Sequence, residues 1–171
     1  LLASHVLWLN LVTDGFLDAS LSLEQPESNL LEISFKQNVR HLISIITILH
    51  IVVLAALSAG ITGFIFTKYL EWFGIERART MCMATLTACQ MINAINSRSL
   101  HRSILHLPLW GNKWLYMALA AIIVVLVSII YIPSLQVIFK TVPLHGIDWL
   151  LIMAVAIVLF CVEELRKRIF F

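Results

Sequence analysis

Charged residues are scarce in this sequence. Asp, Glu, Lys and Arg make up 13% of its 171 residues, whereas a soluble domain carries about 25%. Hydrophobic residues make up 60%, and the mean hydropathy is +0.93. So little charge cannot cover a water-facing surface, which excludes an ordinary water-soluble globular domain. The formal net charge of +2 also gives no electrostatic basis for a nucleic-acid partner.

Cysteine and proline are also rare. The three cysteines all lie within apolar runs: Cys82, Cys89 and Cys161. An odd number of cysteines in such runs predicts unpaired buried thiols rather than a disulfide framework. The four prolines all lie between the apolar runs: Pro26, Pro108, Pro133 and Pro143. Because proline breaks helices, these positions mark connections between helical segments.

The apolar runs themselves predict transmembrane helices. A helix that crosses the hydrocarbon core needs about 20 mostly apolar residues, and the expected spans are residues 1–23, 42–67, 78–96, 113–131 and 147–162. The predicted fold class is all-α, a membrane bundle of five transmembrane helices in one domain over residues 1–171. No segment outside these spans is long enough for a nucleotide-binding or catalytic domain, which needs about 50 residues.

Basic residues predict the orientation of the bundle, because Lys and Arg are retained on the cytoplasmic side of a membrane. One side of the predicted topology carries Lys36, Arg40, Arg98, Arg102, Lys113, Arg166, Lys167 and Arg168. The other side carries Lys68, Arg77, Arg79 and Lys140. We therefore expect an integral, multi-pass membrane protein with a cytoplasmic C-terminus. The lack of an initiator Met predicts that the chain is a piece of a longer polypeptide.

Polar residues interrupt the first span at helical spacing: Asn10, Thr13, Asp14 and Asp18. Ionisable groups inside a membrane are costly and usually mark an ion or proton path. Residues i, i+3, i+4 and i+8 share one helical face, so these oxygens form one stripe of the kind that hard cations bind. Gly15, directly after Asp14, predicts local unwinding of the helix. Asp18 lies nearer the helix end and either lines the ion path or reaches headgroup water.

The third span carries a second polar stripe, and Gln90 is its central residue. A neutral amide can provide an oxygen to a cation, but it can equally form a hydrogen bond between helices. Both alternatives stay open for Gln90, whereas Asn93 and Asn96 are expected to pack or cap the helix. His50 in the second span has no acidic neighbour in the sequence, so it is interpreted as a structural histidine.

Small residues follow one face of the second span: Ala56, Ala59, Gly60 and Gly63. Pairs of small residues four positions apart let another helix approach closely in a membrane. We therefore interpret this face as a helix-packing surface.

Three stretches of the sequence resemble the P-type cation-transporting ATPases, especially calcium pumps of the sarcoplasmic-reticulum type. WLNLVTDG, residues 8–15, is similar to the signature of their sixth transmembrane helix, and RARTMCMATLTACQMINAINSRS, residues 77–99, resembles the eighth. The stretch from PLWGNKWL to GIDWLLI resembles the ninth and tenth helices. The resemblance implies that residues 1–171 are the C-terminal transmembrane domain, helices six to ten.

The resemblance also implies a function. It implies an ATP-driven pump with Ca²⁺ as the transported ion and with Mg²⁺ and ATP bound in cytoplasmic domains outside this chain. The family's DKTGT phosphorylation motif does not occur in this sequence, so the chain alone should not hydrolyse ATP. Its implied partners are the lipid bilayer, helices one to five and the cytoplasmic domains of the same polypeptide. The small-residue face would pack against the fifth helix.

The resemblance assigns roles to individual residues. Asn10 and Asp14 match metal-ligand positions for the transported cation, and Thr13 matches a position used in the second calcium site. Gln90 stands where two-site calcium pumps have a glutamate, which removes one negative charge. Two other functions remain as alternatives: a pump of the same family for a monovalent cation or a proton, and a free-standing five-span membrane scaffold.

Overall fold

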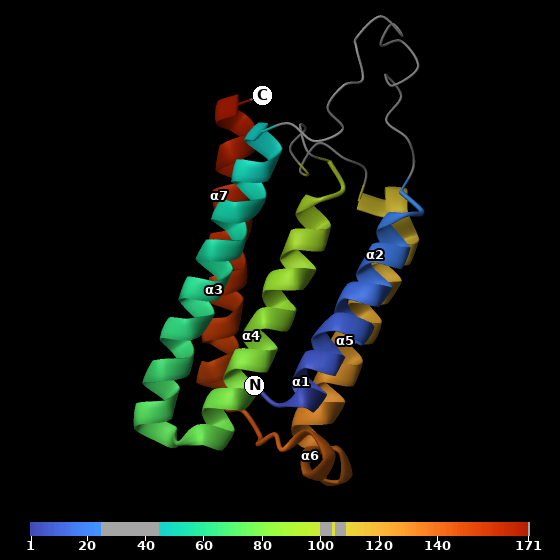
Figure 1. The fold of residues 1–171 in the computed structure, drawn as a ribbon. Coiled ribbons are helices and arrows are strands. Elements are labelled where there is room, and N and C mark those ends of the chain that lie inside the picture. Colours follow the sequence, from blue (N-terminus) through green and yellow to red (C-terminus); the bar gives the residue numbers. More distant parts are fainter. Residues whose placement is uncertain (25–44, 100–103, 105–108, 171) are drawn as a thin grey trace, which may run out of the picture.

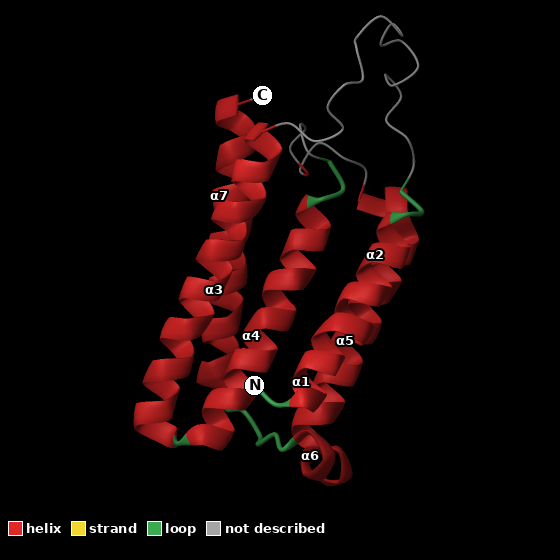
Figure 2. Cartoon of the chain, in the orientation of Figure 1, coloured by secondary structure: helices red, strands yellow, loops and turns green. Residues whose placement is uncertain are grey.

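The computed structural model describes residues 1–24, 45–99, 104 and 109–170. This part of the chain is helical and contains no strand (Figures 1 and 2). Several residues used above lie outside it: Pro26, Lys36, Arg40, Arg102 and Pro108. The first residues of the predicted span 42–67 lie outside it as well. The all-α membrane bundle that the sequence predicts is confirmed.

The helical elements follow the predicted spans with changes at their ends. The first span is a continuous rod of three elements, α1 (Ala3–Leu7), the π-helix η1 (Trp8–Asp14) and α2 (Gly15–Leu21). The long helices that follow are α3 (Ile45–Phe73), α4 (Ile75–Asn96), α5 (Lys113–Tyr131) and α7 (Gly146–Phe170). Two short elements flank α5, the 3-10 helix η3 (Leu109–Asn112) and α6 (Pro133–Phe139).

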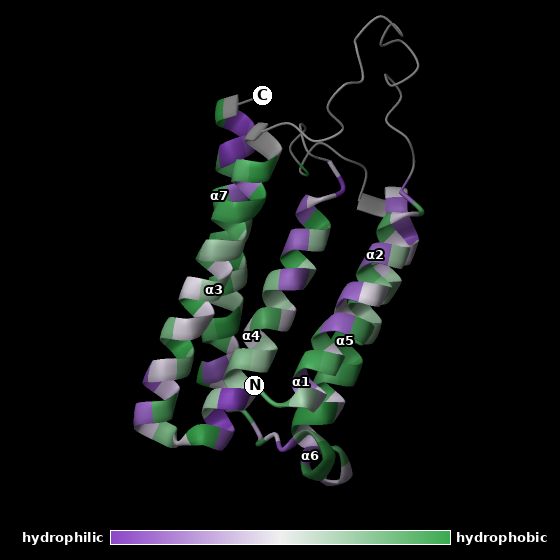
Figure 3. Ribbon diagram, in the orientation of Figure 1, coloured by the Kyte–Doolittle hydropathy of each residue, from purple (hydrophilic) through white to green (hydrophobic). Residues whose placement is uncertain are grey.

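The count of five transmembrane helices needs a correction. Among the described helices, three are long and apolar enough to cross a membrane: Ile48–Phe73, Lys113–Tyr131 and Gly146–Ile169. The first predicted span does not count as one long helix, because its π-helix divides it. Helix α4 is long enough, but it carries too many polar residues to reach the apolar character of a membrane span. Figure 3 shows hydrophilic residues interspersed along α4 and the first rod and gathered at both ends of the bundle. These two segments therefore differ from α3, α5 and α7 in composition as well as in surroundings.

Helix α4 is the centre of the bundle. It packs against α3 and α7 on one side and against η1, α2 and α5 on the other (Figure 1). Its side chains from Met81 to Thr85 are all buried. A helix that is surrounded by protein does not need an apolar surface toward lipid, because neighbouring helices provide partners for its polar groups.

A polar network closes one end of the bundle. Arg98, just after α4, forms an ion pair with Glu24 at 3.0 Å and donates a hydrogen bond to the Tyr116 hydroxyl of α5. Asn112 Nδ2 donates to the Ser20 carbonyl oxygen at 2.9 Å and to Glu24 Oε2 at 2.8 Å. Burial opposes the charged guanidinium, but the hydrogen bonds and the attraction to Glu24 outweigh this effect and raise the pKa of Arg98. The network joins the first rod, α4 and α5.

A second network closes the opposite end and joins α3, α4 and α7. Asp148 is buried at the start of α7. It accepts hydrogen bonds from the Tyr69 hydroxyl of α3 at 2.7 Å and from Arg77 Nη2 of α4 at 2.6 Å. The backbone N–H of His145 donates to the same carboxylate at 2.7 Å. Because every oxygen of this buried carboxylate has a partner, the network stabilises the junction of the three helices.

The described basic residues of the two predicted groups lie at opposite ends. Arg98 lies beside Glu24, and Lys167 Nζ donates to the Asn96 carbonyl oxygen at 2.9 Å, so the ends of α2, α4 and α7 meet. Arg77 lies at the other end, where α4 begins next to Asp148. The separation agrees with the orientation predicted from charge. That the first of these ends faces the cytoplasm stays a prediction.

The small-residue face of α3 is uncovered in the described part of the chain. All four of its residues are exposed: Ala56, Ala59, Gly60 and Gly63. A methyl group built on Gly60 or Gly63 meets no atom within 4 Å. The packing of this face against a fifth helix therefore stays a prediction.

Replacement of Arg98 tests the first network. We expect Arg98→Met to lower the free energy of unfolding by about 2 kcal/mol. Breaking a fully buried ion pair costs about 3–5 kcal/mol, and the cost here is smaller because Glu24 is 22% exposed. The measurement is denaturant unfolding in detergent micelles. The control is Lys68→Met, which breaks the exposed pair between Lys68 and Glu71 and should cost less than about 1 kcal/mol. Equal effects of the two substitutions would contradict the role given to Arg98.

Replacement of Gly60 tests the small-residue face. Gly60→Leu should leave the protease resistance of this chain unchanged, because Gly60 is exposed and a Cβ built at this position meets no described atom within 4 Å. In a longer polypeptide that contains the predicted fifth helix, the same substitution should reduce protease resistance, because it blocks close helix packing. Equal damage in both proteins would show that Gly60 packs within this chain.

Candidate cation site

The predicted cation-binding segment forms the π-helix η1. This element has seven residues, Trp8–Asp14, and contains Asn10, Thr13 and Asp14. Gly15 has ordinary α-helical dihedral angles, φ −58° and ψ −44°, so the expected unwinding at Gly15 is wrong. The helix widens before Gly15 because its backbone hydrogen bonds shift to the longer π spacing. Such π turns are rare and frequently lie at functional sites.

The wider turns separate Thr13 from the rest of the predicted stripe. Thr13 is fully buried, and its hydroxyl donates to the Trp8 carbonyl oxygen at 3.4 Å. Asn10 and Asp18 are exposed and Asp14 is half-buried. A π turn holds more residues than an α turn, so Thr13 lies farther from Asn10 around the helix axis. The structure thus leaves Asn10 and Asp18 exposed and Asp14 half-buried on one face of the rod, its outer face, which the described residues cover incompletely. Thr13 is turned toward its neighbours.

The start of η1 is bonded to α4. Trp8 is 3% exposed and Thr87 is fully buried, and the indole Nε1 of Trp8 donates to Thr87 Oγ1 at 3.1 Å. The Thr87 hydroxyl in turn donates to the Met83 carbonyl oxygen at 3.0 Å. This side-chain hydrogen bond joins the two helices that carry the candidate cation ligands.

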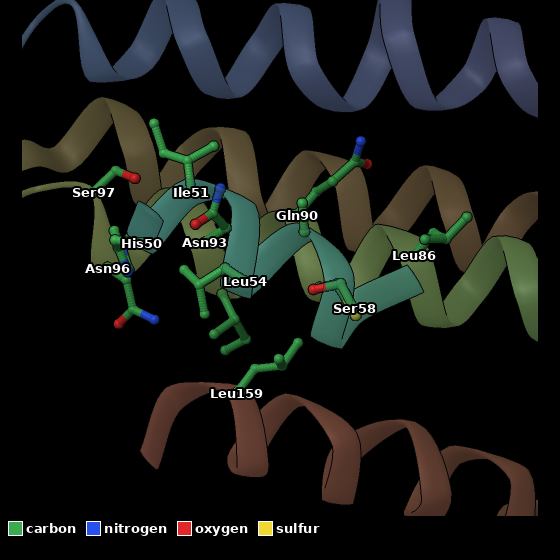
Figure 4. A pocket seen from close by; sticks show the side chains of 13 residues that line it. His50, Ile51, Leu54, Ser58, Leu86, Gln90, Asn93, Asn96, Ser97 and Leu159 are labelled. Carbon is green, nitrogen blue, oxygen red and sulfur yellow. The ribbon is translucent and has the colours of Figure 1, made fainter. Parts of the chain in front are cut away.

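Gln90 lies one helical turn after Thr87. Its Oε1 is buried and has no hydrogen-bond partner among the described residues. In Figure 4 the Gln90 side chain points away from Leu159, toward the side on which the first rod lies, and α4 packs against η1 and α2. A buried acceptor without a partner is costly. A cation, or a hydrogen-bond donor outside the described residues, would therefore stabilise Gln90 Oε1.

Gln90 also borders a cavity between α3, α4 and α7. The cavity has a volume of about 530 Å³, and its polar lining residues include His50, Ser58, Asn93 and Asn96 (Figure 4). Asn96 Oδ1 is buried without a hydrogen-bond partner in the described part of the chain. The sequence placed Asn93 and Asn96 in packing or capping roles, and the structure adds that both line this cavity.

An ion pair of His50 was not visible in the sequence. His50 Nε2 lies 3.4 Å from Glu163 Oε1 of α7, and Arg166 Nη2 binds the same carboxylate at 2.8 Å. Helices α4, α5 and α6 lie between His50 and Glu163 in the chain, so no local spacing could predict the pair. The interpretation of His50 as a structural histidine agrees with this contact.

The donor chemistry of the outer face suits a hard cation. Asn10 and Asp14 provide an amide and a carboxylate, whereas Ca²⁺ takes six to eight oxygen ligands. Within residues 1–24, 45–99, 104 and 109–170, no group of three or more His, Cys, Asp or Glu side chains could hold a metal ion. A cation at Asp14 would therefore need amide, hydroxyl or carbonyl oxygens as well, or ligands from beyond these residues.

Comparisons with known proteins identify the class of this bundle. The sequence matches the family described as "Cation transporting ATPase, C-terminus" over residues 1–169. The chain therefore belongs to this family of membrane regions, which confirms the predicted resemblance.

Individual relatives are named as calcium ATPases. The chain is 25% identical to the endoplasmic reticulum calcium ATPase srcA of Aspergillus fumigatus, with 98% of this chain and 20% of that protein aligned. It is 30% identical to the calcium-transporting ATPase type 2C member 2 of Mus musculus, over 96% of this chain and 18% of that protein. A calcium-transporting ATPase of Plasmodium falciparum is 25% identical, over 95% of this chain and 17% of that protein. The chain thus spans about a fifth of the length of these relatives.

Substitution of Gln90 tests whether it faces a cation. Gln90→Glu adds a carboxylate where a buried oxygen has no hydrogen-bond partner among the described residues. If a cation approaches this oxygen, the added charge should raise the affinity or the number of bound calcium ions and leave the fold intact. The measurement is equilibrium calcium binding to the full-length protein, with Asn93→Asp as the matched control on the next turn. Loss of folded protein without any gain in binding would show that Gln90 serves helix packing.

Proposed function

We propose that this chain is the C-terminal membrane part of an ATP-driven calcium pump. In this proposal Asn10, Thr13, Asp14 and Gln90 contribute oxygens to an intramembrane calcium site. The observation that carries the proposal is the position of Asp14, a half-buried carboxylate at the end of a π-helix inside a membrane bundle. A carboxylate at such a place is costly unless a cation or a proton compensates its charge.

Calcium is favoured over a monovalent cation or a proton. The three relatives described above are named as calcium ATPases. The oxygen donors on η1 are also of the type that Ca²⁺ prefers. Gln90 contributes no charge, so the site holds less negative charge than one with a glutamate at this position. We propose that one calcium ion, rather than two, binds per phosphorylation site.

The remaining parts of the pump lie outside this chain in the proposal. The aligned region is 20% and 17% of the length of two of these relatives, which leaves room for further helices and for cytoplasmic domains. These parts would bind Mg²⁺ and ATP, accept the phosphoryl group and complete the calcium shell around Asp14. The end of the bundle with Arg98 and the C-terminus would face the cytoplasm, in agreement with its larger number of basic residues.

Removal of the Asp14 charge tests the proposal. Asp14→Asn in the full-length pump should abolish calcium-activated phosphorylation from ATP, because the amide keeps one ligand oxygen but removes the negative charge that compensates Ca²⁺ in a site where the other proposed ligands are neutral. The protein should still fold and insert, since the substitution removes an intramembrane charge. The measurement is phosphoenzyme formation as a function of calcium concentration.

Asp18→Asn is the matched control. Asp18 is exposed one turn closer to the end of α2, where headgroup water can reach it, so its substitution should change calcium dependence far less. Normal calcium affinity in Asp14→Asn would contradict the proposed function.

A further inference from the structure

Trp8 is the first residue of the segment that carries the candidate ligands. Asn10, Thr13 and Asp14 follow it within the same π-helix. Whatever fixes Trp8 in space therefore fixes the start of the ligand-bearing segment. Trp8 is buried but uses its indole N–H for a hydrogen bond to another helix.

The bond from Trp8 to Thr87 has a defined direction. The Thr87 hydroxyl donates its only hydrogen to the Met83 carbonyl oxygen at 3.0 Å. Its oxygen is thus left as an acceptor, and the Trp8 indole donates to it at 3.1 Å. A hydroxyl held in this way by its own helix cannot rotate freely, so it fixes the indole more precisely than a freely rotating hydroxyl would.

Trp8 also contacts the far end of η1 through its backbone. Its carbonyl oxygen accepts the hydroxyl of Thr13 at 3.4 Å, five residues later. That spacing matches the hydrogen-bond register of a π-helix. One residue therefore connects α4 with the side chain that precedes Asp14.

Thr87, the acceptor on α4, also lies near Gln90, the candidate ligand on the same helix. Thr87 and Gln90 are three residues apart and so lie on neighbouring positions of one helix face. At its other end the first rod is held by Asn112, which donates to the Ser20 carbonyl oxygen. The candidate ligands on η1 lie between these two points of attachment, Trp8 and Ser20.

We infer that Trp8 is a positioning residue for the cation site. Through its hydrogen bond to Thr87 it holds the π-helix on α4, so that the oxygens of η1 and the amide of Gln90 stay at a fixed separation. This inference rests on the proposed function, because it assumes that a cation binds between these groups. Trp8 itself contributes no ligand.

Substitutions that remove only the hydrogen bond test the inference in the full-length pump. Trp8→Phe keeps an aromatic ring without the N–H, and Thr87→Val keeps the shape without the acceptor. Each should raise the calcium concentration for half-maximal phosphorylation about three- to tenfold, with the maximal phosphorylation unchanged. This shift equals about 0.7–1.4 kcal/mol at about 1.4 kcal/mol per factor of ten, the range of one net hydrogen bond.

Three further variants separate positioning from general damage. Thr87→Ser keeps the acceptor and should restore the wild-type calcium dependence. The double variant Trp8→Phe/Thr87→Val should shift no further than either single variant, because both remove the same bond. Trp149→Phe is the matched control, since it removes an indole hydrogen bond of 2.8 Å to Tyr131 away from η1, and its calcium dependence should equal that of the wild type.

Failure of the inference and failure of the proposed function give different results. Unchanged calcium dependence in Trp8→Phe and Thr87→Val, while Asp14→Asn abolishes activation, would overturn the inference and leave the proposed function intact. Normal activation in Asp14→Asn would overturn the proposed function itself. An equal shift in Thr87→Ser and Thr87→Val would overturn the inference, because Ser keeps the hydroxyl acceptor that Val lacks. If Trp8→Phe fails to fold, this comparison of Thr87→Ser with Thr87→Val decides.

Discussion

The structure depends on one constraint: polar groups at membrane depth need partners from protein, because hydrocarbon provides none. Helix α4 carries Thr, Gln and Asn side chains along its length and is covered on both sides by other helices. The apolar helices α3, α5 and α7 can face lipid, whereas α4 cannot. Its central position follows from its composition, and the remaining helices are arranged around it.

The same constraint explains the polar contacts between helices. Networks around Arg98 and Asp148 close the two ends of the bundle, where charged groups are paired and hydrogen-bonded. Between these ends, the bond from Trp8 to Thr87 joins η1 to α4. Two surfaces stay exposed within the described residues: the outer face of η1 and the small-residue face of α3. Both are expected to contact further parts of a longer pump.

The sequence predicted the helices better than their contacts. The length of the apolar runs located α3, α5 and α7. Helix α7 extends beyond its predicted end, because its charged residues Glu163 and Glu164 are paired with Arg166 and Lys167. Helix α6 was not predicted, because Pro133 was taken as a helix break, whereas it is the first of the seven residues of this helix. The π-helix has no signature in residue type, because it differs from an α-helix only in its backbone hydrogen bonds. The partners Trp8 and Thr87 are 79 residues apart, beyond the reach of any local pattern.

The proposed function depends on one feature above all, a cation bound beside the π-helix where η1 is held on α4. The most direct test is an electron cryo-microscopy map of the full-length protein with bound calcium. We expect cation density about 2.3–2.6 Å from an Asp14 carboxylate oxygen, next to a π-helical η1. Cation density remote from Asp14, with this carboxylate facing lipid, would contradict the account.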